Sequence, residues 1–169
     1  MGKVLLIIAP ENFQDKEFSV PKKIIEEAGH QIEVAAKYKG EARGQQGTTC
    51  QVEKSLMEIA VDGYDGVLLV GGAGAVTYFE DQNVHQIVRY ANDCNKAIGA
   101  INIAPSILAN AGILSGRRAS VFPSQEENLR EKGAELMSSD VTLDGKIVTA
   151  SGPYAVEEFA YKFVEALKR

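Results

Sequence analysis

Three short and uninterrupted apolar runs constrain the fold of this chain more than any other feature. They cover Val4 to Ile8, Val67 to Val70 and Ala97 to Ile101. A strand that is apolar at every position has to be buried on both faces, which is typical of a parallel sheet covered by helices. The runs therefore predict the central strands of such a sheet.

Helical patterns separate these runs along the chain. The predicted helices are Pro21 to Ala28, Val84 to Ala91, Pro105 to Ala111 and an amphipathic segment from Phe159 to Leu167. Weaker strand signals lie at Ile32 to Ala35, around Thr48 to Val52, and at Val141 to Thr149 with an Asp144-Gly145 hairpin turn. Strands that alternate with helices predict one α/β domain over residues 1–169, with a doubly wound, mostly parallel sheet between two layers of helices.

Charge and composition exclude several classes of partner. The formal net charge is −5, so we expect no basic surface for nucleic acid or anionic lipid. The apolar run from Val4 to Ala9 is far shorter than the roughly 20 residues that span a bilayer, so we predict no membrane segment and a cytoplasmic location. Cys50 and Cys94 show no zinc or redox spacing, which predicts free thiols and no metal or other cofactor.

In a doubly wound sheet the working site lies beyond the carboxyl ends of the strands, and Asn102 follows the strand predicted at Ala97 to Ile101. Small residues, Ala100 and Ala104, flank Asn102 two positions away on either side. This is the steric pattern of a nucleophile elbow, whose central residue is forced toward positive φ. Asparagine tolerates that conformation but supplies no nucleophile. The alternative is an ordinary loop in which Asn102 caps the next helix.

The glycine-rich segment from Gly71 to Ala75 follows another predicted strand. Thr77 stands where a dinucleotide fingerprint needs its third glycine, so nucleotide binding is a weak hypothesis. We instead predict that backbone N–H groups at Gly71, Gly72 and Ile103 form an oxyanion hole. Glycines that serve only tight packing are the alternative.

Glu17 follows the first strand and is expected at, or just before, the start of a helix, where a carboxylate is favoured. Its alternative role is that of a simple helix cap. His30 follows a helix-ending glycine and His85 lies in an amphipathic helix, so both are predicted to be solvated. Without Cys, Ser or His at the elbow, these residues cannot form a nucleophilic triad.

Several motifs occur together in a fixed order. They are Glu17 with Pro21 and Glu27-Ala28-Gly29-His30, Gly71-Gly72-Ala73-Gly74-Ala75, Ala100-Ile101-Asn102-Ile103-Ala104-Pro105, Ala111-Gly112 and Gly116, Asp144-Gly145-Lys146, Ala150-Ser151-Gly152-Pro153, and Glu158-Phe159-Ala160. With these motifs, almost the whole chain resembles the ThiJ/PfpI superfamily, also called the DJ-one family, which has a flavodoxin-like fold of the class I glutamine amidotransferase type.

The resemblance implies cysteine-dependent hydrolase chemistry of a peptidase, glyoxalase or deglycase type, with stress-protective or chaperone-like roles. It implies a small carbonyl or peptide-like substrate and a homodimer or larger homo-oligomer. The family's reactive cysteine falls on Asn102 and its partner glutamate on Glu17. Phe122, Gly152 and Pro153 are then expected to line the crevice. Some members carry a histidine directly after the cysteine or before a proline, but this chain has Ile103 and Phe122 at those positions.

Asn102 therefore departs from the family pattern at the reacting atom, which leaves open whether the chain is an enzyme. One interpretation is an altered cysteine position in an otherwise intact and now inactive hydrolase site. The other is a natural, non-catalytic binding or chaperone-like stress protein. Both predict positive φ at Asn102 and a direct side-chain hydrogen bond from Asn102 to Glu17, at about 2.8 to 3.1 Å.

Overall fold

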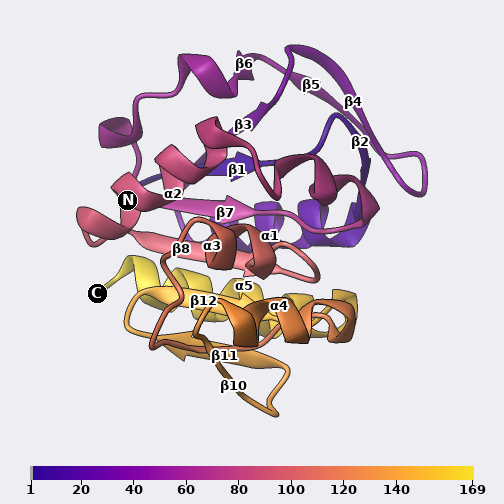
Figure 1. The fold of residues 1–169 in the computed structure, drawn as a ribbon. Helices are drawn as coiled ribbons and strands as arrows, with labels where there is room; N and C mark the ends of the chain where they lie inside the picture. Colours follow the sequence, from indigo (N-terminus) through magenta and orange to yellow (C-terminus); the bar gives the residue numbers. More distant parts are fainter. Residues whose placement is uncertain (1) are drawn as a thin grey trace.

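A seven-stranded sheet forms the centre of the protein in a computed structural model that describes residues 2–169 (Figure 1). Its strands, in spatial order, are β11 (Val141–Asp144), β12 (Ile147–Ala150), β8 (Ala97–Ile101), β7 (Gly66–Leu69), β1 (Lys3–Ile7), β3 (Gln31–Ala36) and β6 (Lys54–Ser55). All neighbouring strands pair in parallel except β11 and β12, which form the predicted antiparallel hairpin. The predicted mostly parallel, doubly wound sheet is confirmed.

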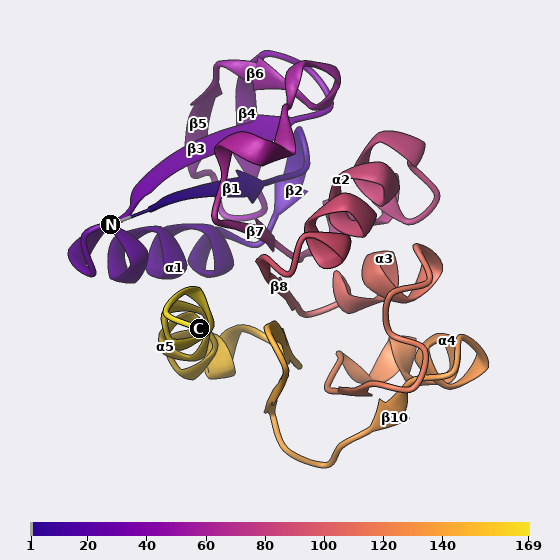
Figure 2. The same cartoon turned by 90° about the vertical axis from the view of Figure 1, so that its left-hand side faces the viewer.

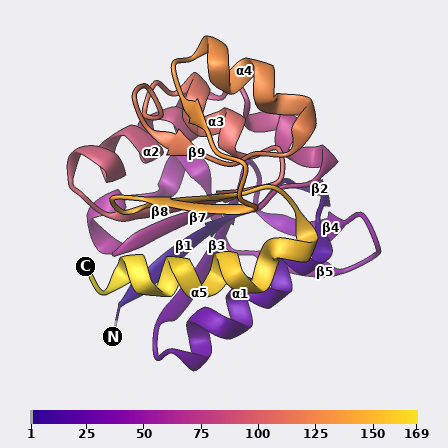
Figure 3. The same cartoon turned by 90° about the horizontal axis from the view of Figure 1, so that it is seen from below.

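Helices cover both faces of this sheet (Figures 2 and 3). One layer contains α1 (Asp15–Glu27) and α5 (Val156–Leu167). The other contains α2 (Gln82–Asp93), α3 (Pro105–Asn110) and α4 (Glu126–Glu131). None of the helices within residues 2–169 is long and apolar enough to cross a membrane.

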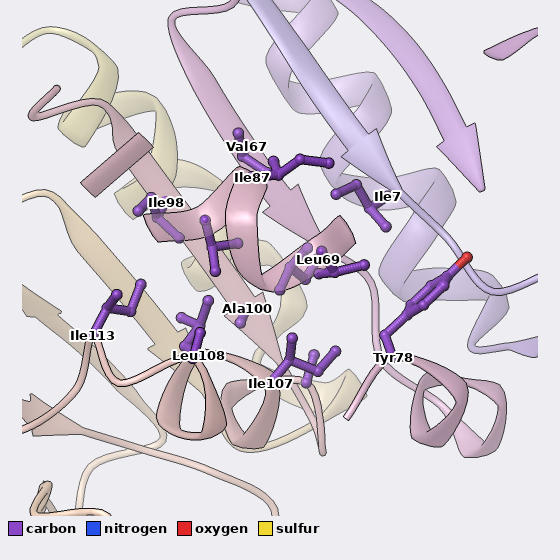
Figure 4. Packing of buried hydrophobic residues seen from close by; sticks show 14 of the residues in the cluster. Ile7, Val67, Leu69, Tyr78, Ile87, Ile98, Ala100, Ile107, Leu108 and Ile113 are labelled. Carbon is purple, nitrogen blue, oxygen red and sulfur yellow. The ribbon is translucent and has the colours of Figure 1, made fainter. Parts of the chain in front are cut away.

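Two hydrophobic cores, one on each face, explain why the central strands are apolar throughout. Along β1, Leu5 and Ile7 belong to the core under α2 and α3, whereas Val4 and Leu6 belong to the core under α1 and α5. Figure 4 shows Ile7, Leu69 and Ile98 from three strands packed against Ile87, Ile107 and Leu108 from the helices. Full burial of each such side chain contributes about 1.5 to 3 kcal/mol before conformational entropy is counted.

Smaller elements lie around the sheet. A second sheet has the order β2 (Glu11–Phe13), β4 (Gly40–Gly44), β5 (Thr49–Val52), and a third pairs β9 (Arg118–Ala119) with β10 (Glu135–Leu136). The 3-10 helices within residues 2–169 are η1 (Leu56–Glu58), η2 (Val61–Gly63), η3 (Ala73–Tyr78), η4 (Pro123–Gln125) and η5 (Pro153–Ala155). Of the second sheet, only β5 matches a strand signal in the sequence.

Helix α1 begins six residues before the predicted start at Pro21. The side chain of Gln14 caps the helix by accepting the N–H of Glu17 at 2.9 Å. Pro21 lies inside the helix, where it cannot donate to the carbonyl of Glu17 four residues earlier. The sequence pattern was misleading because proline is common at the first helical position, whereas glutamine is an uncommon cap.

His85 was predicted to be solvated, and this prediction is wrong. It lies in the first turn of α2 and is only 2% exposed. Its Nε2 lies 2.8 Å from the carbonyl oxygen of Phe79, in the segment that leads from η3 into α2. The preceding chain therefore covers the imidazole and satisfies its polar atom, which a helical pattern alone does not reveal.

Candidate functional site

The turn between β8 and α3 holds Asn102 in a left-handed conformation with φ of 68°. Its N–H donates to the carbonyl of Ala150 at the end of β12, at 2.9 Å. Its carbonyl accepts the N–H of Phe122, also at 2.9 Å. Few residues other than glycine adopt positive φ, and asparagine is the most tolerant of them. The predicted elbow geometry is therefore confirmed, and hydrogen bonds fix its backbone from two sides.

Glu17, the third residue of α1, is fully buried and turns its carboxyl group toward this elbow. Its Oε2 accepts a hydrogen bond from Asn102 Nδ2 at 2.9 Å, as predicted, and its Oε1 accepts the N–H of Gly71 at 3.1 Å. A glutamate in a capping box would instead reach back to the N–H of the capping residue. Here that N–H, from Gln14, donates to the carbonyl of Gly71 at 2.9 Å. Glu17 is therefore not a simple helix cap.

Burial determines the charge of Glu17. Removal from water raises the pKa of its carboxyl group to about 7, although the hydrogen bonds from Asn102 and Gly71 act in the opposite direction. Near neutral pH the group is thus present in both its protonated and its ionised form. A carboxyl group with such a pKa beside a strained turn is typical of a functional site.

The glycines of the segment from Gly71 to Ala75 are needed for close packing. A Cβ atom on Gly71 would lie 2.5 Å from Asn102 Cβ and 2.6 Å from Glu17 Oε1. A Cβ atom on Gly72, where φ is 103°, would lie 2.8 Å from Gln45 Oε1. Protein atoms therefore occupy the space beside these glycines, which favours the packing explanation over an open phosphate cradle.

The structure changes the predicted oxyanion hole. The N–H of Gly71 already donates to Glu17, so Gly71 is not a free donor and that part of the prediction is wrong. The N–H groups of Gly72 and Ile103 form no hydrogen bond with protein atoms among residues 2–169. Ile103 directly follows the elbow residue, where a backbone N–H commonly lines an oxyanion hole. Both remain candidate donors.

The three expected crevice residues are far from Asn102 in the sequence, and backbone hydrogen bonds join the elbow to Phe122 and to the end of β12. Phe122, which is 38% exposed, is joined to Asn102 through its backbone N–H. Gly152 and Pro153 follow β12, whose last residue accepts the N–H of Asn102. For residues 2–169, no hydrogen bond connects Gly152 or Pro153 to Asn102. Their place in the crevice stays a prediction.

The sequence patterns did not single out Gln45, which supports the site from the turn between β4 and β5. The side chain of Gln45 accepts the N–H of Ala73 at 2.7 Å. Asp15, at the start of α1, holds the turn between β4 and β5 by accepting the N–H groups of Gln46 and Thr48, at 2.8 and 2.9 Å. Burial acts to raise the pKa of Asp15, but the hydrogen bonds from the Thr48 side chain and from the backbone N–H groups of Gln46 and Thr48 together lower it.

Neither cysteine lies at the elbow. Cys50 is a half-buried residue of β5 and Cys94 is exposed at the end of α2, and both are free thiols. Burial raises the pKa of the Cys50 thiol, which makes it a poor nucleophile. Among the described residues, no group of three or more His, Cys, Asp or Glu side chains could hold a metal ion. The site thus combines a carboxamide, a buried carboxyl group and two unpaired N–H groups.

Comparisons with known proteins show the family and the fold of the chain. The sequence profile of the DJ-1/PfpI family matches residues 2–166. A ThiJ/PfpI domain protein from Brachyspira murdochii superposes with a TM-score of 0.96 at 31% identity, covering 98% of this chain and 96% of that one. A deglycase of Pyrococcus abyssi is 27% identical over 97% of this chain and 99% of its own length. General stress protein 18 of Bacillus subtilis is 28% identical over 100% of both chains.

Proposed function

The chain belongs to the DJ-1/PfpI family, and on that premise we propose that its site is that of a cysteine-dependent hydrolase in which Asn102 stands at the position of the nucleophile. The expected class is that of a deglycase, glyoxalase or peptidase, with a stress-protective role. One observation carries the proposal: Asn102 has φ of 68° and donates to buried Glu17 at 2.9 Å. This chain then has no thiol-dependent turnover.

The chemistry of the parent site explains the expected loss. A thiolate at position 102 would attack a carbonyl carbon, and the N–H groups of Gly72 and Ile103 would stabilise the resulting oxyanion. A carboxamide has no comparable lone pair for attack, because its nitrogen is conjugated with the carbonyl group. Asn102 therefore preserves the shape and polarity of the elbow but cannot form the covalent intermediate.

A second candidate is a natural, non-catalytic binding or chaperone-like stress protein. The direct bond from Asn102 to Glu17 favours it, because the pair satisfies the buried carboxyl group without a thiol. Under either candidate we propose a single domain over residues 1–169, a cytoplasmic location and a homodimer or larger homo-oligomer. The proposed ligand is a small carbonyl or peptide-like compound.

Activity assays separate the two candidates. We would measure consumption of an α-oxoaldehyde such as methylglyoxal, and cleavage of a peptide, by the chain itself, by Asn102→Cys and by Asn102→Ala. Turnover by Asn102→Cys alone supports the altered hydrolase. A reactive but non-catalytic thiol in Asn102→Cys supports the binding protein. Turnover that persists in the Asn102 chain after replacement of both Cys50 and Cys94 by serine would refute the proposal.

A further inference from the structure

The hydrogen bonds of Glu17 are chemically unequal. Oε1 accepts from the backbone N–H of Gly71, which can only donate. Oε2 accepts from the side-chain amide of Asn102, which carries a donor and an acceptor on the same carbon. Only the bond to Asn102 can therefore reverse its direction, and it does so if the amide plane turns over.

The other end of the same amide is free. Asn102 Oδ1 has no hydrogen-bond partner among residues 2–169. In that part of the chain, no fully buried side-chain nitrogen or oxygen lacks a partner, so Oδ1 must reach solvent. While Glu17 is ionised, Asn102 thus directs its NH₂ group to the carboxylate and leaves its carbonyl oxygen accessible.

Protonation of Glu17 reverses this arrangement. A protonated carboxyl group has to donate through one oxygen, and the N–H of Gly71 cannot accept. The proton must then lie on Oε2, where Asn102 can accept it only through Oδ1. The amide consequently turns over, and its NH₂ group becomes the accessible end, beside the chain segment that carries the unpaired N–H of Ile103.

We propose that Glu17 and Asn102 form a proton-controlled binding site for an oxygen acceptor, either a carboxylate or a carbonyl group, in which protonated Glu17 turns the Asn102 NH₂ group toward the ligand. The inference rests on the proposed function, because it concerns the same ligand site. It adds the chemical class of the ligand and the protonation of Glu17 as the control of ligand binding. It requires no covalent step, so it holds whether Asn102 replaced a cysteine or is original.

The surroundings of Glu17 favour control of the Asn102 orientation by the proton of the Glu17 carboxyl group alone. Its pKa of about 7 is set by burial and by the hydrogen bonds from Asn102 and Gly71. The charged groups on the elements around it are otherwise engaged or exposed. Asp15 on α1 binds the turn of the second sheet, Arg43 on β4 pairs with Glu41, and Lys22 on α1 pairs with Glu26. The exposed groups include Glu11 on β2, Lys16, Lys23 and Glu27 on α1, and Glu157 and Glu158 on α5.

The available donors determine the ligand class. With Glu17 protonated, the site offers the Asn102 NH₂ group and the N–H of Ile103, so it suits a ligand oxygen with free lone pairs. With Glu17 ionised, the accessible Oδ1 and the buried negative charge both disfavour such an oxygen. A cationic donor should show the opposite preference.

Nuclear magnetic resonance on the full chain tests the inference directly. The side-chain amide signals of Asn102 should shift with a single midpoint near pH 7 in the absence of ligand. Acetate and acetone serve as charged and neutral acceptor probes, and methylammonium as the donor probe. For both acceptors, affinity should be constant below about pH 6 and fall about tenfold per pH unit above pH 7, whereas methylammonium should bind more tightly as pH rises.

Glu17→Gln is the matched variant, because its amide places an NH₂ group against Asn102 and so fixes the turned state at every pH. Acceptor binding in this variant should be independent of pH and equal to the low-pH value of the parent. Asn102→Ala should lose the pH-dependent binding, with its fold checked by the backbone spectrum. Binding by acetate but not acetone would assign the site to carboxylates, and the converse would assign it to carbonyls.

Two outcomes would overturn the inference: Asn102 signals that do not respond to pH between 5 and 9, or acceptor binding with the same pH dependence in Glu17→Gln as in the parent. Neither depends on turnover. Failure of Asn102→Cys to become an enzyme would refute the hydrolase proposal and leave these results unaffected.

Discussion

Two neighbouring turns, one after β7 and one after β8, both contain a residue with positive φ, but they use it differently. After β7, Gly72 has φ of 103° and the space beside it is occupied by protein atoms. After β8, Asn102 has φ of 68° and carries a polar side chain bonded to Glu17. The first turn satisfies a packing requirement. The second holds a functional group in a strained position.

The difference shows why conformation alone does not identify a site. Positive φ occurs at several glycines of this chain with nothing nearby, including Gly29, Gly47 and Gly112. At Asn102, the same conformation coincides with a buried carboxyl group whose pKa is raised to about 7. Strain together with a perturbed titratable neighbour, rather than strain by itself, distinguishes the turn after β8.

The largest effect is expected for Gly71→Ala, which tests the packing role of the turn after β7. The new Cβ would lie 2.5 Å from Asn102 Cβ and 2.6 Å from Glu17 Oε1, so the elbow or α1 must move. We expect a loss of more than about 3 kcal/mol in the free energy of unfolding. Urea denaturation measures it. Gly63→Ala, with nothing within 4 Å of its Cβ, is the control and should change stability by less than about 1 kcal/mol.

The pH dependence of stability tests the buried carboxyl group near the turn after β8. In the folded protein the pKa of Glu17 is about 7, against an ordinary value of 4.5, so the folded state binds this proton more tightly. Its contribution to stability is fully present below pH 4.5 and is lost as pH rises through about 7. At about 1.4 kcal/mol per pH unit, the loss is about 3 kcal/mol.

Comparison with Glu17→Gln isolates that contribution, because glutamine stays neutral. The variant and the parent should be similarly stable at pH 5, and the variant should be more stable at pH 8 by up to about 3 kcal/mol. Urea denaturation at both pH values provides the measurement. A variant that is equally destabilised at pH 5 and pH 8 would show that Glu17 does not carry a raised pKa.

Asn102→Cys tests whether the turn after β8 activates a nucleophile. The unpaired N–H of Ile103 and a protonated Glu17 both stabilise a thiolate at this position, whereas burial raises the pKa of Cys50. We expect the new thiol to be alkylated at least about tenfold faster than Cys50 at pH 7. The alkylation rate of the new thiol is measured by mass spectrometry of the intact protein in a Cys50→Ser/Cys94→Ser background. The alkylation rate of Cys50 is measured in the parent protein. A thiol that titrates near 8.5 would contradict an activating elbow.

Sequence patterns predicted the parts of this site that local rules determine. The apolar runs located β1, β7 and β8, because strands buried on both faces cannot alternate. Small residues around Asn102 indicated the elbow, because a sharp turn leaves no room for larger ones. The contact from Asn102 to Glu17 was expected from the family resemblance, which places the partner glutamate of the elbow residue at Glu17.

The remaining features depend on contacts between segments far apart in the sequence. Gln45 reaches Ala73 only because β4 and β5 fold back beside β2. The N–H of Gly71 was expected to be a free donor because only its own turn was considered. In the structure it donates to Glu17, a residue 54 positions away. His85 is buried by the chain that precedes its helix. Periodicity describes one element at a time and does not include these neighbours.

The smallest effect is expected for Gln45→Ala, which tests whether the two turns are independent. Gln45 is exposed, and its Oε1 accepts the N–H of Ala73 at 2.7 Å, so water can replace it when the side chain is removed. We expect a loss of about 0.5 to 1 kcal/mol in the free energy of unfolding. The Asn102 amide should still titrate near pH 7, because Gln45 makes no contribution to the pKa of Glu17. If removal of Gln45 instead moved that midpoint by a full pH unit, the glycine-rich turn would be controlling the elbow, and packing and function could not be assigned to separate turns.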